Sequence, residues 1–410
     1  MTPAKSYTEM KDSGIEWVGM IPAHWHIKVL FQLVSQVKNK NKDLSETNLL
    51  SLSYGKIKRK NIDDTEGLLP ASFDSYNIIE NNDIVLRLTD LQNDHTSLRV
   101  GRATERGIIT SAYITIRPTN SRMSEYLYYL LHSFDIKKGF YGMGSGVRQG
   151  LNYDEVKMLK LPLPPLDEQS AIASYLDTQC AKIDEIIAQA KASIEDYKQW
   201  KASIIYEAVT KGLDPNVEMK DSGIPWIGRM PANWTAPALK YLCIMQAGKN
   251  LISEQISTSG QYPVYGGNGQ RGYYSDYNAN GNFLLVGRQG ALCGNVHCVS
   301  GKFWATEHAV VTTPSKITNI RYLYYLLIAM DLNQYASNSA AQPGLSVGNI
   351  LNVKTLLPPI GEQVRISKFL DNCCPRIDEV ITEKQSLIDD LESYKKSLIY
   401  EVVTGKRRVC

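Results

Sequence analysis

Apolar residues recur at steps of three, four and seven positions through residues 161–212 and again through residues 356–410. Such steps place apolar side chains along one stripe of an α-helix. A stripe of this length is typical of helices that pair, so we predict two long antiparallel coiled-coil spacer helices. Packing of each helix on its own domain is the alternative. The residues expected at the helix contacts are Leu176, Ile183, Ile187, Ile194, Leu370, Ile377, Ile381, Ile388, Leu391 and Leu398.

Prolines punctuate both helical segments. Pro164-Pro165 and Pro358-Pro359 precede them, and acidic residues follow where the first turn of a helix favours negative charge. Pro375 lies inside the second segment, which predicts a short helix at about 362–372 and a long one from about 375 to 403. We expect the first segment to bend similarly near Gln179.

The chain is internally duplicated. The run from Met10 to Trp25 returns as the run from Met219 to Trp234, 209 residues later, and we name each copy the Trp motif. The segment that begins at Pro164 returns at Pro358, 194 residues later, and continues without a gap. Because only two copies occur and each holds a whole domain, a solenoid of stacked repeats is excluded. We attribute the tryptophans of the Trp motif, Trp17, Trp25, Trp226 and Trp234, to packing.

Two regions of unlike sequence, 26–160 and 235–354, lie between the repeated segments. They share only echoes, such as the helix-like block Tyr-Leu-Tyr-Tyr-Leu-Leu near the end of each region. Apolar runs that end in arginine predict buried strands at 83–88 and 283–291. We therefore predict a mixed α/β fold with a pseudo-twofold duplication, in which two globular domains with twisted sheets and short helices are separated by the spacer helices. The predicted division is 1–160, 161–212, 213–355 and 356–410.

Composition and charge narrow the class of protein. With 43% hydrophobic and 21% charged residues, the sequence is that of a folded protein. It has neither an apolar run of membrane-spanning length nor the apolar core of a signal peptide, so we expect a cytoplasmic protein. Regions 26–160 and 235–350 carry net charges of +4 and +3, whereas region 161–211 carries −3. This distribution suits two DNA-facing domains on a spacer that binds protein.

Motifs for catalysis and metal binding are missing from the sequence. We find no phosphate-binding loop, no amino-methyltransferase run, no zinc-protease motif and no nucleophile elbow. Seven cysteines at irregular spacing predict reduced thiols. Cys293, His297 and Cys298 lie close together, but a zinc site usually shows a second ligand pair, so we expect no metal. We interpret His308 as a core or hinge histidine.

Two motifs together resemble those of a known family. The doubled Trp motif, Met-Lys-Asp-Ser-Gly-Ile-x-Trp-x-Gly-x-x-Pro-x-x-Trp, is one of them. The other is Leu-Pro-x-Pro-Pro-x-x-Glu-Gln followed by a long helix that ends in Ser-x-Ile-x-Glu-x-Val-Thr, as at 203–210 and 397–404. The combination resembles the specificity subunits of type I restriction–modification enzymes over essentially the whole chain.

The resemblance implies a function and a set of partners. Two target-recognition domains would each read one part of a split double-stranded DNA sequence, and the spacer helices would fix the gap and bind two methyltransferase subunits. It also implies adenine methylation with S-adenosylmethionine in those partners, and ATP-dependent translocation and cleavage, with Mg²⁺, in restriction (motor) subunits. No catalytic centre, cofactor or metal is expected in this chain itself.

Candidate DNA contacts in the second region cluster on polar, glycine-rich stretches. We expect a loop at 266–272, whose glycines permit close approach to a backbone and whose polar side chains suit adenine or guanine. Its G-x-G-x-x-G spacing is not a dinucleotide site, because no apolar-periodic helix follows. A plain surface turn is the alternative. The candidates are Tyr265, Asn268, Gln270, Arg271, Arg288, Gln289 and Gln342.

The first region offers a basic cluster, a strand-end arginine and a second glycine-rich loop. The cluster would neutralise phosphates without reading sequence, or it is merely a solvated charged loop. Arg87 is either a DNA contact or the partner of a nearby acid such as Asp83 or Asp90. The candidates are Lys56, Lys58, Arg59, Lys60, Arg87, Ser145, Arg148 and Gln149.

Two other classes of function remain open. A self-sufficient nuclease with unrecognised carboxylates would cleave plasmid DNA with Mg²⁺ alone. A helical scaffold that binds only protein would show no sequence-selective DNA binding, even with methyltransferase partners.

Overall fold

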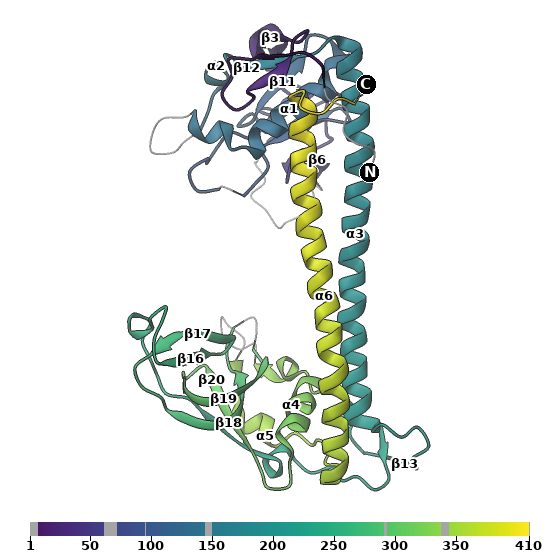
Figure 1. Ribbon diagram of the computed structural model, residues 1–410, viewed down its shortest axis with the longest axis vertical. Helices are drawn as coiled ribbons and strands as arrows, with labels where there is room; N and C mark the ends of the chain where they lie inside the picture. The colour runs from purple at the N-terminus through teal and green to yellow at the C-terminus, as the bar shows by residue number, and fades with distance from the viewer. Residues whose placement is uncertain are drawn as a thin grey trace. The chain divides into compact units, whose positions relative to one another are not determined.

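The computed structural model describes residues 7–60, 72–94, 96–143, 150–290, 293–337 and 344–409, and divides into two compact units. Unit 1 comprises Met1–Ala190 and Ser386–Cys410, and unit 2 comprises Lys191–Gln385. Two long helices, α3 (Leu166–Lys211) and α6 (Ile360–Val403), each contribute one half to either unit (Figure 1). The predicted division follows the sequence repeat, whereas these units follow the packing.

Unit 1 contains short strands around one central sheet. The sheet has the order β4-β11-β8-β9 and is antiparallel, and β10-β7, β5-β6, β12-β3 and β1-β2 form two-stranded pairs. Helix α1 covers β9 and carries the predicted helical block. The elements are β1 Met10–Asp12, β2 Met20–Pro22, β3 His26–Val29, β4 Val34–Gln36, β5 Leu50–Ser53, β6 Lys56–Arg59, β7 Asn77–Ile79, β8 Ile84–Leu86, β9 Val100–Arg102, β10 Gly107–Ile109, β11 Ile114–Pro118, β12 Lys160–Leu163, α1 Ser124–Ile136 and α2 Tyr153–Val156.

Unit 2 has a larger sheet of order β15-β20-β18-β19-β16-β17, antiparallel except where β16 meets β19. Helix α4 lies between this sheet and α6, and Arg321 and Tyr325 of α4 both bind Asp371 of α6 (Figure 1). The elements are β13 Met219–Asp221, β14 Arg229–Pro231, β15 Cys243–Ala247, β16 Tyr262–Gly266, β17 Gly269–Tyr274, β18 Ala279–Gly287, β19 Val296–Ala305, β20 Ala309–Pro314, β21 Ala336–Ser337, β22 Gly344–Leu345, α4 Ile320–Ala329 and α5 Val347–Leu351.

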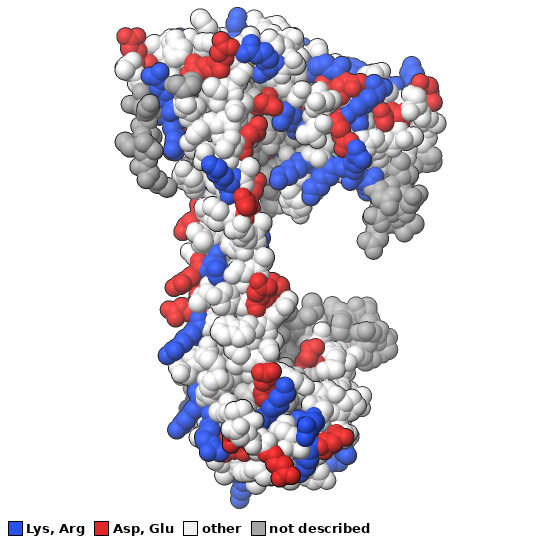
Figure 2. All heavy atoms as spheres, turned by 90° about the vertical axis from the view of Figure 1, so that its right-hand side faces the viewer, with Lys and Arg blue, Asp and Glu red and all other residues white. Residues whose placement is uncertain are grey.

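The two long helices pair in antiparallel fashion within each unit. In unit 1, Lys395 of α6 donates to Asp184 of α3 at 2.6 Å. In unit 2, the duplicated pair is Lys201 of α3 and Asp378 of α6, at 2.6 Å. Of the ten predicted contact residues, eight are buried, and Ile381 and Leu391 are half-buried. The prediction of paired spacer helices is therefore confirmed. Acidic and basic side chains are interspersed along the face of the helix pair in Figure 2.

The predicted break of the second helix at Pro375 is wrong. Helix α6 continues through this proline without interruption, and α3 likewise continues through Gln179. Proline in a helix interior costs about 3 kcal/mol because its ring removes one hydrogen bond and crowds the preceding turn. The neighbouring Leu370, Cys374 and Ile377 are at most 4% exposed, and their burial offsets that cost.

Each Trp motif packs on the end of a long helix from the other repeat. Tyr206 near the end of α3 donates to the carbonyl oxygen of Trp226, and Tyr400 near the end of α6 donates to that of Trp17. Trp25 and Trp234 are fully buried, so packing explains these tryptophans as predicted. Within the described residues, no helix combines the length and the apolar character needed to cross a membrane.

Candidate nucleic-acid interface

Four of the candidate residues of unit 2 line one recess of about 400 Å³. It is lined by Gly267, Asn268, Gln270, Arg271, Gln289, Gly290 and His308. A second hollow beside it is lined by Ala247, Arg288, Gln289, Gly344, Leu345, Ser346 and Val347. Because Gln289 belongs to both, five residues singled out by the sequence lie on one continuous surface.

The predicted loop at 266–272 is a β-hairpin instead. Strands β16 and β17 pair up to Gly266 and Gly269, so only Gly267 and Asn268 turn the chain. Gly269, which follows these two residues, has φ +97°, a left-handed conformation that glycine adopts without strain. A Cβ at Gly267 would lie 3.0 Å from the carbonyl oxygen of His308, so the hairpin tip rests on that backbone. Strand β17, not a helix, follows the glycines, in line with the rejection of a dinucleotide site.

Tyr265 is a packing residue of this hairpin. Its ring meets that of Phe303 edge to face at 5.6 Å, and its carbonyl oxygen accepts the N–H of Thr306 at 2.9 Å. This arrangement turns the ring into the small core beneath the sheet. The exposed members of the candidate set are Asn268, Gln270, Arg271, Arg288 and Gln289.

Arg288 and Gln289 follow β18, as the apolar run predicted. The N–H of Arg288 donates to the carbonyl oxygen of His308, and the carbonyl oxygen of Arg288 accepts the N–H of Leu345, both at 2.9 Å. The backbone is therefore fixed on both sides, while both side chains stay exposed. Neither Arg271 nor Arg288 forms an ion pair within the described part of the chain, so both guanidinium groups can meet an external acceptor.

The basic cluster of unit 1 is a strand, not a loop. On β6, Arg59 pairs with Glu105, whose pKa is lowered by the hydrogen bond from that guanidinium. Lys56 lies 3.9 Å from Asp184 of α3. Lys58 and Lys60 are exposed and have no ion pair within the described residues, so they are the members of the cluster best placed to meet phosphates.

Arg87 occupies the predicted end of a buried strand, β8, and is half-buried. The alternative partner Asp83 is taken by Arg117, at 2.7 Å from its Nε. Asp90 instead accepts a hydrogen bond from the amide of Asn93. Within the described residues Arg87 therefore has no acidic partner, which keeps it a candidate for DNA.

Sequence reasoning missed Arg99, which builds the segment that carries Arg87. Its side chain is fully buried, yet it donates to the carbonyl oxygens of Arg87, Thr89, Asp90 and Asp94. Hydrogen bonds from Ser97 hold the pKa of Asp94 well below its usual value. The free-energy cost of burying a charged arginine is offset only when its N–H donors find such a full set of acceptors. No feature of the sequence distinguishes Arg99 from a surface arginine.

The remaining predicted site residues are either outside the described residues or placed differently from the prediction. Ser145, Arg148, Gln149 and Gln342 lie outside the described residues. Among those that are described, no group of three or more His, Cys, Asp or Glu side chains could hold a metal ion. His308 is half-exposed and lines the recess, so it is not a core histidine, and the alternative that it is a hinge stays a prediction.

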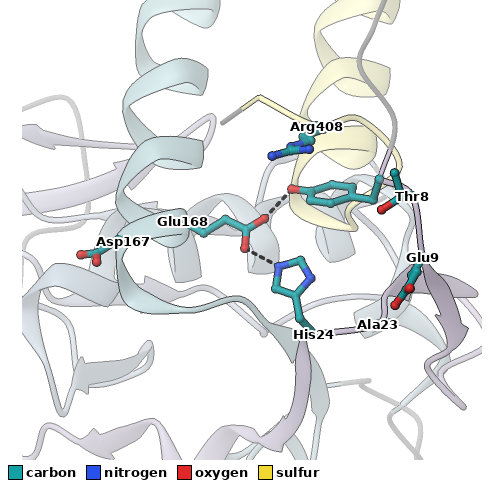
Figure 3. A pocket seen from close by; sticks show the side chains of 8 residues that line it. Thr8, Glu9, Ala23, His24, Asp167, Glu168 and Arg408 are labelled. Carbon is teal, nitrogen blue, oxygen red and sulfur yellow. Dashed lines mark hydrogen bonds and ion pairs between the residues drawn. The ribbon is translucent and has the colours of Figure 1, made fainter.

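A separate hollow of about 440 Å³ in unit 1 lies where α3 begins. His24 Nε2 lies 2.8 Å from Glu168 Oε2, and Tyr7 donates to the other oxygen of that carboxylate (Figure 3). Asp167, also at this helix start, is bound by Arg122. Three acids line this hollow beside one arginine, Arg408, so it is poorly suited to a phosphate backbone.

Comparisons with known proteins identify the family to which the chain belongs. The family profile described as "Type I restriction modification DNA specificity domain" matches twice, over residues 31–196 and 231–388. The chain is 48% identical over 131 residues to the type I restriction enzyme EcoprrI specificity subunit of Escherichia coli, a match that spans 31% of this chain and 32% of that relative. It is 25% identical to the putative type I restriction enzyme MjaX specificity subunit of Methanocaldococcus jannaschii over 96% of both chains.

A solved structure shares the fold. A chain from the work "Structural basis underlying complex assembly and conformational transition of the type I R-M system" aligns over 93% of this chain and 98% of its own, with a TM-score of 0.69 and 16% identity. Two family matches that together cover most of the chain establish its membership. The chain belongs to the type I restriction–modification DNA specificity family and is a specificity subunit that recognises a DNA target.

Proposed function

We propose that the chain reads a split DNA target, one part with each unit. The observation that carries this proposal is the duplication of one scaffold around two unlike globular regions. If both regions read the same bases they would be expected to share their exposed polar residues, but the helical block that recurs in both, at 126–131 and 322–327, is mostly buried. Two globular regions of different sequence, each attached to an equivalent copy of the scaffold, suit a DNA target with two different parts.

The candidate DNA contacts of the two units differ in chemistry. The amide and guanidinium side chains of the unit 2 recess suit the edges of adenine and guanine in the major groove. Lys58 and Lys60 of unit 1 suit phosphates, which fix position but carry no sequence information. Arg87 is the candidate of unit 1 for a base or a phosphate.

The paired helices would dock the partner subunits. Two methyltransferase subunits would bind the spacer helices, one for each repeat, and restriction subunits would join this assembly. Exposed charged side chains such as Lys182, Glu185, Lys198 and Glu379 support this role, because they are not used in the helix pair. S-adenosylmethionine, ATP and Mg²⁺ would act in these partners. The chain itself would supply no catalytic group and would act in the cytoplasm.

Methylation mapping tests the proposal directly. DNA from cells that carry the chain with its methyltransferase partner should show methylated adenines in one split motif of fixed gap. Replacement of region 235–354 by that of another specificity subunit should change one part of the motif only. The purified chain with Mg²⁺ should leave plasmid DNA intact, since cleavage would favour the nuclease alternative. Absence of any methylated motif would favour the scaffold alternative.

A further inference from the structure

The recess of unit 2 has an unusual lining for a cavity of its size. Every side chain that lines it can form hydrogen bonds, and its two other residues, Gly267 and Gly290, are glycines. Another hollow in the same unit is lined by Val296, Leu327 and Ile328 among others. Small-molecule sites are mostly apolar with a few polar groups. The recess therefore suits a ligand that offers several hydrogen-bonding groups, as base pairs do in the major groove.

His308 is the member of this lining that the sequence did not point to. It lies in the turn between β19 and β20, and its carbonyl oxygen accepts the N–H of Arg288 and lies close to the hairpin tip at Gly267. The ring is 42% exposed, so it is available to a ligand. Three separate segments of unit 2 thus bring hydrogen-bonding side chains to one place.

Glu307 lies against the ring of this histidine. Its Oε1 lies 3.2 Å from His308 Nε2, a contact that orients the ring. An imidazole ring carries two nitrogens that can form hydrogen bonds, so it can pair with the edge of a base in the major groove.

We infer that His308 reads one base in the part of the target that unit 2 contacts, and that Glu307 is its positioning residue. Gln270, Arg271 and Gln289 are the neighbouring readers in the same recess. This inference rests on the proposed function of unit 2 in DNA recognition, and it names the residues that read one base.

The test uses the complete methyltransferase assembly with H308A, H308Q, E307Q and Q289A. Gln261 is an exposed residue at the start of the same hairpin that does not line the recess, so Q261A is the matched control. We expect H308A to lower affinity for the cognate duplex about tenfold, as loss of one hydrogen bond does, and to leave affinity for non-cognate DNA unchanged. In methylation maps, H308A should relax one position of the wild-type motif.

The other variants separate reading from folding. H308Q and E307Q should change the base preference at that same position, which a merely structural role of Glu307 would not do. Q261A should retain the wild-type motif. The inference is overturned if H308A and H308Q both keep the wild-type motif and affinity, if they weaken cognate and non-cognate binding equally, or if both unfold unit 2 by circular dichroism. A wild-type assembly without any split methylated motif would instead contradict the proposed function.

Discussion

The indole Nε1 of Trp234 donates a hydrogen bond to Glu362 at 2.9 Å, and its duplicated counterpart Trp25 makes no such bond. The carboxylate equivalent to Glu362 is Glu168, which is occupied by His24 and Tyr7. The Nε1 of Trp25 is consequently buried without a partner among the described residues. Two copies of one motif thus use the same acid in different ways.

This difference predicts unequal effects of the same substitution. W234F removes a hydrogen bond to a carboxylate, whereas W25F removes a buried donor that has no acceptor. Both lose similar apolar volume. We expect W234F to lower the free energy of unfolding by about 1–3 kcal/mol more than W25F does. Urea denaturation of the two variants and the wild type measures this, and equal losses would contradict it.

The helix pair predicts a second contrast. Ile183 is 6% exposed, whereas Ile381 is half-buried although both were expected at the helix contact. We expect I183A to lower the free energy of unfolding by about 2–5 kcal/mol, as large-to-small changes in a core do. I381A, the matched control, should cost clearly less because its methyl groups already meet solvent. Thermal unfolding followed by circular dichroism compares the two, and a larger loss for I381A would show that the burial is misjudged.

The sequence predicted the helix pair well because a stripe of apolar residues is a local and periodic signal. It predicted Leu176 and Leu370 correctly, and both are fully buried. It failed at Pro375, where packing of neighbouring side chains outweighs a local preference of the residue. Arrangements of this kind depend on tertiary contacts that a periodic pattern does not contain.

In the candidate site, too, local features were predicted correctly and tertiary arrangements were not. Strand-end arginines such as Arg288 follow from a local pattern of apolar residues and were placed correctly. The recess that joins Arg271, Gln289 and His308 depends on how three segments distant in sequence meet. His308 carries no periodic or compositional signal, so its position could not be predicted. The roles of all these residues in DNA binding remain predictions.

Helix α1 of unit 1 holds two buried groups whose charges respond to pH in opposite ways. Burial lowers the pKa of His132 to about 4, with a further contribution from Lys395. Burial raises the pKa of Asp135 to about 6. The folded state therefore takes up the Asp135 proton below pH 6, and the unfolded state takes up the His132 proton below pH 6.5.

These two effects nearly cancel in the wild type and separate in single variants. His132 makes stability fall as pH falls from 6.5 to 4, and Asp135 makes it rise as pH falls from 6 to 3.8. In D135N the effect of His132 is no longer opposed by that of Asp135. The free energy of unfolding of D135N, relative to that of the wild type, should therefore rise by about 3 kcal/mol from pH 4 to 6.5. H132Q should show the opposite slope. Urea denaturation at several pH values measures both, and parallel curves for all three proteins would refute this assignment.

Exposed aromatic residues on the long helices predict where partner subunits bind. Trp200 and Tyr394 occupy equivalent positions in the duplicated helices, and they are 54% and 40% exposed. Large aromatic side chains carry much of the energy of protein interfaces. If each repeat docks one methyltransferase subunit, W200A and Y394A should each weaken one of two equivalent sites by about 10- to 100-fold.

Stoichiometry distinguishes this outcome from a general loss of stability. Each single variant should bind one methyltransferase subunit at concentrations where the wild type binds two, and W200A/Y394A should bind neither, as measured by native mass spectrometry. Tyr241 is 61% exposed but lies in the globular region of unit 2, so Y241A should keep the wild-type stoichiometry. If the double variant still binds two methyltransferase subunits, the docking surface does not include Trp200 and Tyr394. Loss of a central aromatic side chain from each of two equivalent sites should weaken both sites.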